Sequence, residues 1–282
     1  MKPTKSRCLS IFLALCTLPL VDLAEMSIAS NSDSLVPASA NGKSSSAQAD
    51  SVEQTSQSEP KEGDSKIHVA VITGGHGFDE ESFLSLFKGH DDVAFDHLAQ
   101  EDDSEVFEDI SDWQYDVIVF YHMTQKISPQ RQAIFLHLLD QGVGVVALHH
   151  SIAAFQDWPE YEKIIGGKYL LKDRAEKEGN GKASGFKHDV EFTIHLEDHP
   201  ITQGLKDFKV QDETYINCTF EPDNTPLLTT DDPTSDKLIG WTRTYRNARI
   251  CYIQPGHGVS IFANETYQSI VARAIRWCAG RM

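Results

Sequence analysis

The chain is poor in cysteine, in basic residues and in long apolar segments, and each shortage excludes a class of protein. Its 282 residues contain 5 cysteines, too few for a disulfide framework to hold the fold together. Lysine and arginine number 25 against 42 aspartates and glutamates, and the formal net charge of −17 opposes binding to nucleic acid or anionic lipid. No later stretch approaches the roughly 20 apolar residues of a membrane helix, so we expect no transmembrane segment in the mature protein.

The first residues have the pattern of a secretion signal. A cationic start precedes an apolar run from Cys8 to Leu20, which is short for a membrane helix. Small side chains favour cleavage near Ala29. The segment Leu13–Cys16 is similar to a lipoprotein acylation site, but the leucine before its cysteine is larger than usual, so a lipid anchor is the less favoured alternative. We therefore predict a signal peptide over 1–29 and a secreted or periplasmic protein.

One folded domain should follow a disordered tether. Residues 30–65 are rich in Ser, Ala and acidic or amide side chains and have hardly any large apolar ones, so they cannot form a core. Apolar periodicity begins at Lys66, which predicts a single domain over 66–282. Of the cysteines, Cys218, Cys251 and Cys278 stay in the mature chain. They allow either one disulfide with a free thiol or three thiols.

Strand and helix patterns alternate along the first half of this domain. We expect strands at 67–73, 93–98, 115–121 and 143–148, and helices at about 79–88 and 128–139. In the second half, strand-like pieces lie at 188–196, 208–212, 227–230, 238–244 and 249–254, after an exposed excursion over 168–187 and before a last helix at about 264–279. These later pieces should add antiparallel or edge strands. The pattern predicts an α/β, flavodoxin-like, doubly wound and mostly parallel sheet with extra edge strands.

Histidines recur where the predicted strands end. In an open parallel sheet ligands bind at the carboxyl ends of the strands. The residues at these ends are Gly74, Gly75 and His76 after the first strand, His122 after the third, His149, His150 and Ser151 after the fourth, and Gly256, His257 and Gly258 after the last. The glycines would let the backbone approach a ligand, although a simple tight turn is the alternative for Gly74 and Gly75.

A serine and a pair of carboxylates complete the set of polar residues. Ser151 fits a helix N-cap better than a nucleophile, because the glycines of a Gly-x-Ser-x-Gly or Gly-x-Cys-x-Gly elbow are missing. Asp212, Glu213 and Tyr215 follow a predicted strand and suit acid–base work, sugar binding or metal coordination, with a solvated acidic turn as the alternative. His188 and the remaining histidines show no convergent partners in the sequence, so we assign them no role.

These motifs, in this order and spacing, resemble the ThuA-like (trehalose utilisation) family. The shared motifs are Gly74-Gly75-His76, Gly144 to Ser151, Trp158-Pro159-Glu160-Tyr161 before Gly166-Gly167, Asp212-Glu213-x-Tyr215 and Gly256-His257-Gly258, over roughly residues 66–280. The resemblance implies a class I glutamine-amidotransferase-like fold without the amidotransferase cysteine, and use of trehalose or a related disaccharide. Motif by motif, it implies that the site residues are His76, His149, His150, Asp212, Glu213 and His257.

The sequence leaves several functions open. Our first hypothesis is a sugar-processing enzyme acting on a disaccharide or a keto-glycoside, with His149, His150, Asp212, Glu213 and His257 as the catalytic set. Substrate would be held by Gly74, Gly75, His76, His122, Ser151 and Tyr215. The alternatives are a hydrolase in which histidines and a carboxylate hold a divalent metal, and a non-catalytic carbohydrate-binding module. Amidase or protease chemistry would need a competent nucleophile, which we do not find.

Overall fold

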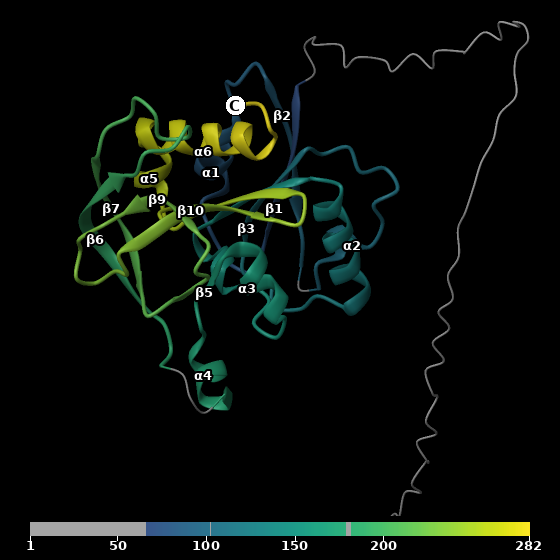
Figure 1. Ribbon diagram of the computed structural model, residues 1–282, viewed down its shortest axis with the longest axis horizontal. Helices are drawn as coiled ribbons and strands as arrows, with labels where there is room; N and C mark the ends of the chain where they lie inside the picture. Colours follow the sequence, from purple (N-terminus) through teal and green to yellow (C-terminus); the bar gives the residue numbers. More distant parts are fainter. Residues whose placement is uncertain (1–65, 102, 179–181) are drawn as a thin grey trace, which may run out of the picture. The chain divides into compact units, whose positions relative to one another are not determined.

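The computed structural model describes residues 66–101, 103–178 and 182–282. The predicted signal peptide and tether therefore lie outside the described residues. The domain is built around a nine-stranded sheet in the order β2-β1-β3-β4-β11-β10-β9-β6-β7 (Figure 1). Within the described ranges, no helix has the length and apolar character needed to cross a membrane.

Five neighbouring strands of this sheet run parallel. They are β2 (Val93–Ala99), β1 (Ile67–Gly74), β3 (Val117–His122), β4 (Gly144–Leu148) and β11 (Ala248–Ile253). β3 and β4 are buried along their whole length, as expected for strands covered on both faces. The order corresponds to 2-1-3-4-5 along the sheet, which confirms the flavodoxin-like prediction. The expectation for β11 was wrong: it is the fifth parallel strand, paired with β4, and not an antiparallel or edge strand.

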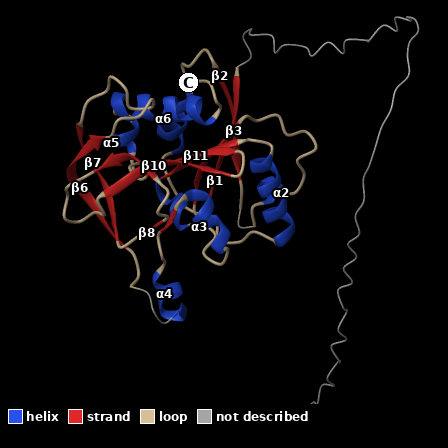
Figure 2. Cartoon of the chain, in the orientation of Figure 1, coloured by secondary structure: helices blue, strands red, loops and turns tan. Residues whose placement is uncertain are grey.

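The other four strands extend the sheet in antiparallel fashion, as expected. They are β10 (Leu238–Tyr245), β9 (Thr225–Thr229), β6 (Gly185–Leu196) and β7 (Phe208–Ile216) (Figure 2). A separate two-stranded ladder joins β5 (Gly167–Lys168) to β8 (Thr219–Phe220). β7 continues to Ile216, so the prediction that Asp212 ends this strand was wrong. Asp212 and Glu213 lie within the strand and not in a turn.

Helices cover both faces of the parallel half. One core cluster joins the sheet to α1 (Glu80–Leu84), α5 (Val259–Phe262) and α6 (Glu265–Cys278), and a second joins it to α2 (Pro129–Asp140) and α3 (Pro159–Ile165) (Figure 1). As predicted, α2 begins at a proline behind the capping Ser128. Three short 3₁₀ helices lie at Ser85–Phe87, Glu105–Phe107 and His149–Ala153. The expected excursion after Lys168 contains α4 (Lys172–Glu178).

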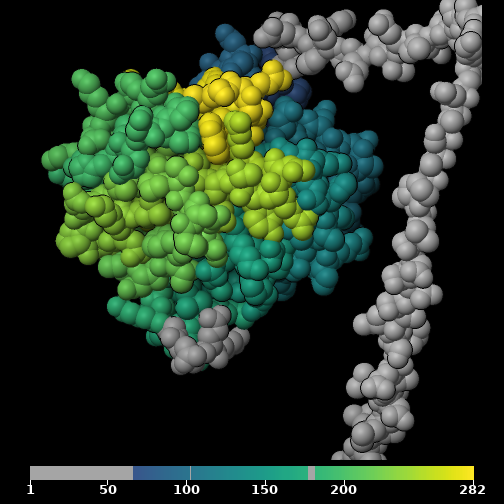
Figure 3. All heavy atoms as spheres, in the orientation of Figure 1, coloured from purple at the N-terminus to yellow at the C-terminus, as the bar shows by residue number. Residues whose placement is uncertain are grey.

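The two halves of the domain pack as one hydrophobic unit. Figure 3 shows the green and yellow second half lying directly against the teal first half. Strands from both halves contribute side chains to the same core clusters. Cys218, Cys251 and Cys278 are free thiols, and the last two are buried. The structure therefore agrees with the three-thiol alternative.

The glycine pair after β1 is required by packing. Gly74 has φ +150, and a Cβ on it would lie 2.3 Å from the backbone oxygen of Gln100. A Cβ on Gly75, which has φ +72, would lie 2.7 Å from the backbone of Met123. Both positions are therefore restricted to glycine, because neighbouring loops press against them. This close approach of loop to loop brings the ends of β1 and β3 together.

Candidate functional site

A cavity of about 230 Å³ opens where the parallel strands end. Its lining combines imidazoles and one carboxylate with aromatic and aliphatic side chains. The lining residues are His76, Met123, His149, His150, Ala153, Tyr169, Leu171, Phe186, His188, Glu213, Tyr215 and His257. They come from the segments after β1, β3, β4, β5 and β11 and from the antiparallel strands β6 and β7. This cavity is the candidate site.

His149 is held as a neutral imidazole with a defined tautomer. It follows β4 in a left-handed conformation, φ +50, which is uncommon for a residue other than glycine and is often found at functional sites. Its Nδ1 lies 2.8 Å from the backbone oxygen of Gln254, and a carbonyl can only accept, so Nδ1 carries the proton and Nε2 carries a lone pair. Burial lowers the pKa of His149 to about 3, which keeps the ring neutral.

The Nε2 lone pair of His149 remains open toward the cavity. Tyr215 stacks on this imidazole with an interplanar angle of 24° and ring centroids 5.1 Å apart. Its hydroxyl lies 3.0 Å from Nε2 and 3.4 Å from Nδ1, hence over the ring face and not in the ring plane. Nδ1 of His257 lies 3.3 Å from the same Nε2.

Strand β7 supplies two adjacent carboxylates that point to opposite faces. Successive side chains of a strand alternate, so Glu213 and Tyr215 face the cavity while Asp212 faces away from it. Asp212 accepts hydrogen bonds from the backbone N–H groups of Gly256, at 2.6 Å, and His257, at 3.0 Å. Burial raises the pKa of Asp212 to about 6, although these hydrogen bonds favour the ionised form. Asp212 therefore anchors the loop that carries His257.

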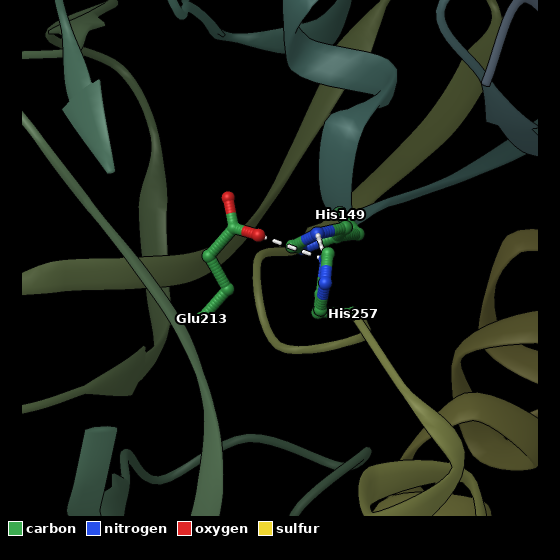
Figure 4. A group of neighbouring side chains, drawn as sticks. All are labelled: His149, Glu213 and His257. Atoms are coloured by element: carbon green, nitrogen blue, oxygen red, sulfur yellow. Dashed lines mark hydrogen bonds and ion pairs between the residues drawn. The ribbon is translucent and has the colours of Figure 1, made fainter. Parts of the chain in front are cut away.

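Glu213 is the buried carboxylate of the cavity. Its Oε2 lies 2.8 Å from Nδ1 of His257 and 3.0 Å from Nδ1 of His188. Figure 4 shows the carboxylate of Glu213 directed at the imidazoles of His149 and His257. Burial, followed by the charge of Asp212, raises the pKa of Glu213 to about 7. Glu213 can therefore exchange a proton near neutral pH.

A β-bulge brings His188 to this carboxylate. The register of β6 and β7 shifts between Lys187 and Val190, so that His188 and Asp189 together face the single residue Glu213. Asp189 adopts φ +55 at the bulge. The sequence analysis assigned His188 no role, because a bulge leaves no signal in strand periodicity.

His150 and His76 form the opposite wall. Both ring nitrogens of His150 are buried and lack a hydrogen-bond partner in the protein. Burial, with the neighbouring imidazoles, lowers the pKa of His150 well below its usual value. The ring of His76 lies 4.5 Å from it, centroid to centroid. A buried polar ring without a partner is costly, so we expect a ligand atom or water to bond to it.

Part of the cavity lining is apolar. Tyr169, Leu171, Phe186 and Met123 line it, and Phe186 is 57% exposed although it is a large hydrophobic side chain. Aromatic faces exposed beside polar groups suit ligands that have an apolar face and polar edges, as sugar rings do. The cavity thus combines polar and apolar lining side chains.

The cavity gathers most of the site residues expected from the sequence, but not all. His76, His149, His150, Glu213, Tyr215 and His257 line it. Gly74, Gly75, His122, Ser151 and Asp212 are not among its lining residues. The prediction of an N-cap at Ser151 was wrong: its hydroxyl donates to the backbone oxygen of Phe120 at 2.9 Å, because the residue lies inside a 3₁₀ helix.

His122 lies beneath the cavity in the core. It is fully buried, its Nδ1 accepts a hydrogen bond from Nε2 of Gln100 at 3.3 Å, and burial lowers its pKa to about 3. In the unfolded chain the same imidazole titrates near 6.5. Between these values the folded state binds fewer protons than the unfolded state, so stability is lost as pH falls below about 6.5.

We expect His122→Asn to make the free energy of unfolding less dependent on pH. An asparagine oxygen can still accept from Gln100, but the change removes one titrating group, worth about 2 kcal/mol between pH 8 and pH 5. The measurement is denaturant unfolding at a series of pH values. His137→Asn, at an exposed position of α2, is the control. An unchanged slope for His122→Asn would contradict the assignment of His122 as a buried neutral imidazole.

Comparison with known proteins agrees with this architecture. In solved structures, the chain is similar to a ThuA-like protein from Parabacteroides merdae, at 20% identity and TM-score 0.63 over 76% of this chain and 90% of that one. A ThuA-like protein from Bacteroides uniformis matches at 18% identity and TM-score 0.51, over 77% and 93% of the two chains. No curated protein matches. The family model described as ThuA, trehalose utilisation, matches residues 68–278. The chain therefore belongs to the ThuA family, which is linked to trehalose utilisation and so to carbohydrate metabolism.

Proposed function

We propose that the protein is an exported enzyme of carbohydrate catabolism that acts on a disaccharide or a keto-glycoside by histidine and carboxylate chemistry. The observation that carries the proposal is the position of Glu213. Its carboxylate is buried at the floor of the cavity, has a pKa raised to about 7 and lies within 3.0 Å of two imidazoles. A general base or acid is most effective when its pKa is near the working pH.

The apolar and the polar side chains of the cavity would serve binding and chemistry, respectively. The aromatic side chains of Phe186 and Tyr169 would pack against the face of a sugar ring. The polar side chains of the cavity would then lie beside the reacting atoms. There Glu213 would either take a proton from the carbon beside a carbonyl or protonate a glycosidic oxygen. His257 and His188 can exchange that proton with Glu213, since each imidazole lies within hydrogen-bond distance.

Among the residues that the structure describes, the candidate serine and two of the cysteines are not arranged as nucleophiles on the cavity. Ser151 lies where a strand meets a helical turn, but its hydroxyl is buried and bonded to the backbone of Phe120. Cys251 and Cys278 are buried, and burial raises the pKa of each thiol. None of these groups is an activated nucleophile on the cavity, so acyl transfer through serine or cysteine is disfavoured.

The test is product analysis by mass spectrometry with a panel of disaccharides and their keto-derivatives, with and without added divalent metal ions. We expect a product from at least one member of the panel, and its loss in Glu213→Gln. Saturable sugar binding without any product would contradict catalysis and favour a carbohydrate-binding module. Product formation that Glu213→Gln leaves unchanged would contradict the assignment of the site.

A further inference from the structure

We propose that His149, His257 and Glu213 together hold one divalent transition-metal ion, such as Zn²⁺, at the floor of the cavity. This inference rests on the proposed function only for its location, because it places the ion in the same cavity. Two imidazole nitrogens and one carboxylate oxygen are a donor set that binds such ions in proteins, with open positions left for water or substrate.

The distances between the ligand atoms suit a common ion. Nitrogen and oxygen ligands lie about 2.0–2.2 Å from Zn²⁺, which puts neighbouring ligand atoms about 3.0–3.5 Å apart. Nε2 of His149 lies 3.3 Å from Nδ1 of His257, which lies 2.8 Å from Oε2 of Glu213. One ligand atom from each of the three residues lies within 4.8 Å of the others. Figure 4 shows the three side chains converging on one point.

The protonation state of His149 is that of a metal ligand. A ligating histidine must be neutral, and it usually donates its other N–H to a backbone carbonyl or a carboxylate. The bond from Nδ1 to the oxygen of Gln254 meets this requirement. It leaves Nε2 as the unprotonated nitrogen, 3.3 Å from Nδ1 of His257, and Tyr215 stacks on the face of the ring.

The loop that carries His257 is also held in position before an ion binds. The carboxylate of Asp212 accepts hydrogen bonds from the backbone N–H groups of Gly256 and His257 and so positions the imidazole of His257. Glu213 brings a buried carboxylate among the imidazoles of His257 and His188. A cation among them would offset that negative charge.

The open side of the ion would face the sugar. His76, His150 and His188 line the cavity around the three ligands without belonging to them. An ion at this point can polarise a carbonyl oxygen or lower the pKa of a bound water. With an ion bound, Glu213 would serve as a ligand, so loss of Glu213 would stop the reaction in either case.

Metal binding is measured directly, without an activity assay. The purified protein is stripped with a chelator, dialysed and titrated with Zn²⁺, Co²⁺ and Mn²⁺ by calorimetry, and metal content is determined after gel filtration. We expect one ion per chain. His149→Ala, His257→Ala and Glu213→Gln should each weaken binding by at least about 100-fold, more than loss of an outer-shell partner typically does. His137→Ala, an exposed histidine on α2, should bind like the wild type.

The possible outcomes test the ion site and the proposed enzymatic function separately. Thermal unfolding of each variant in chelator shows whether it is folded, and Zn²⁺ should raise the melting temperature of the wild type and His137→Ala but not of the three ligand variants. Absence of stoichiometric binding, or binding that all three variants retain, would overturn the ion site. A metal-free protein that still forms product would leave the proposed function intact, whereas bound metal without product would leave only the ion site.

Discussion

Glu213→Gln is expected to lower kcat/KM by about 10³-fold on the substrate that the panel yields. Glutamine keeps the size and shape of the side chain but can neither take nor give the proton, and loss of a general acid or base typically costs 10²–10⁴-fold. If an ion is bound, the amide is also a much weaker ligand than the carboxylate. The measurement is initial rate against substrate concentration at neutral pH, with KM and kcat determined separately.

The matched control for this variant is Glu191→Gln. Glu191 lies on the adjacent strand β6 with a side chain that is 78% exposed, and it is not among the residues that line the cavity. We expect its kcat/KM to stay within about 3-fold of the wild type, since surface substitutions have small effects. A Glu213→Gln protein that works as well as this control would place the chemistry elsewhere in the cavity.

The same substitution should stabilise the metal-free protein above pH 7. The pKa of Glu213 is raised to about 7 in the fold and is near 4.5 when exposed, so the ionised carboxylate opposes folding as pH rises through that window. A shift of this size corresponds to at most about 3 kcal/mol, and glutamine also weakens the contacts to His257 and His188, so we expect the free energy of unfolding at pH 8 to rise by about 1 kcal/mol. Lower activity with higher stability would mark Glu213 as a residue kept for function.

The parallel half of the fold was predictable because its strands are nearly uniform apolar runs. β3 and β4 are buried along their whole length, and such runs are distinctive in sequence. β11 was predictable as a strand, but its position in the sheet was not. It pairs with β4 only after the chain has formed four antiparallel strands in between. β7 was predicted too short because Asp212 and Glu213 are unfavourable strand residues, retained here by tertiary contacts.

The site was predictable where it follows parallel strands and not where it comes from antiparallel ones. His76, His149 and His257 each follow a strand of the parallel half, so topology alone brought them to one edge. His188 reaches Glu213 through a bulge whose position depends on the pairing of β6 with β7. The sequence offered a metal-dependent hydrolase only as an alternative, because no compact spacing joins His149, Glu213 and His257, which come together through contacts between distant segments.

Gly256→Ala is expected to reduce both stability and activity, because the loop that carries His257 is pressed against His149. Gly256 has φ +151, and a Cβ on it would lie 3.1 Å from Cβ of His149 and 3.0 Å from the hydroxyl of Tyr267. Strained backbone and close contacts of this kind cost about 2–3 kcal/mol. A shift of His257 by about 1 Å would lower kcat/KM by about 10²-fold, since catalysis depends on exact placement.

Gly258 provides the comparison within the same loop. A Cβ on Gly258 has no atom within 4 Å, and its φ of −146 is extended backbone that any residue adopts. Gly258→Ala should therefore cost less than about 1 kcal/mol, mainly as a poorer cap for α5, and leave activity nearly unchanged. Denaturant unfolding and kcat/KM of the two variants separate the explanations. Equal effects would mean that general loop stiffness matters, whereas a large effect confined to Gly256 would mean that contact with His149 holds His257 in place.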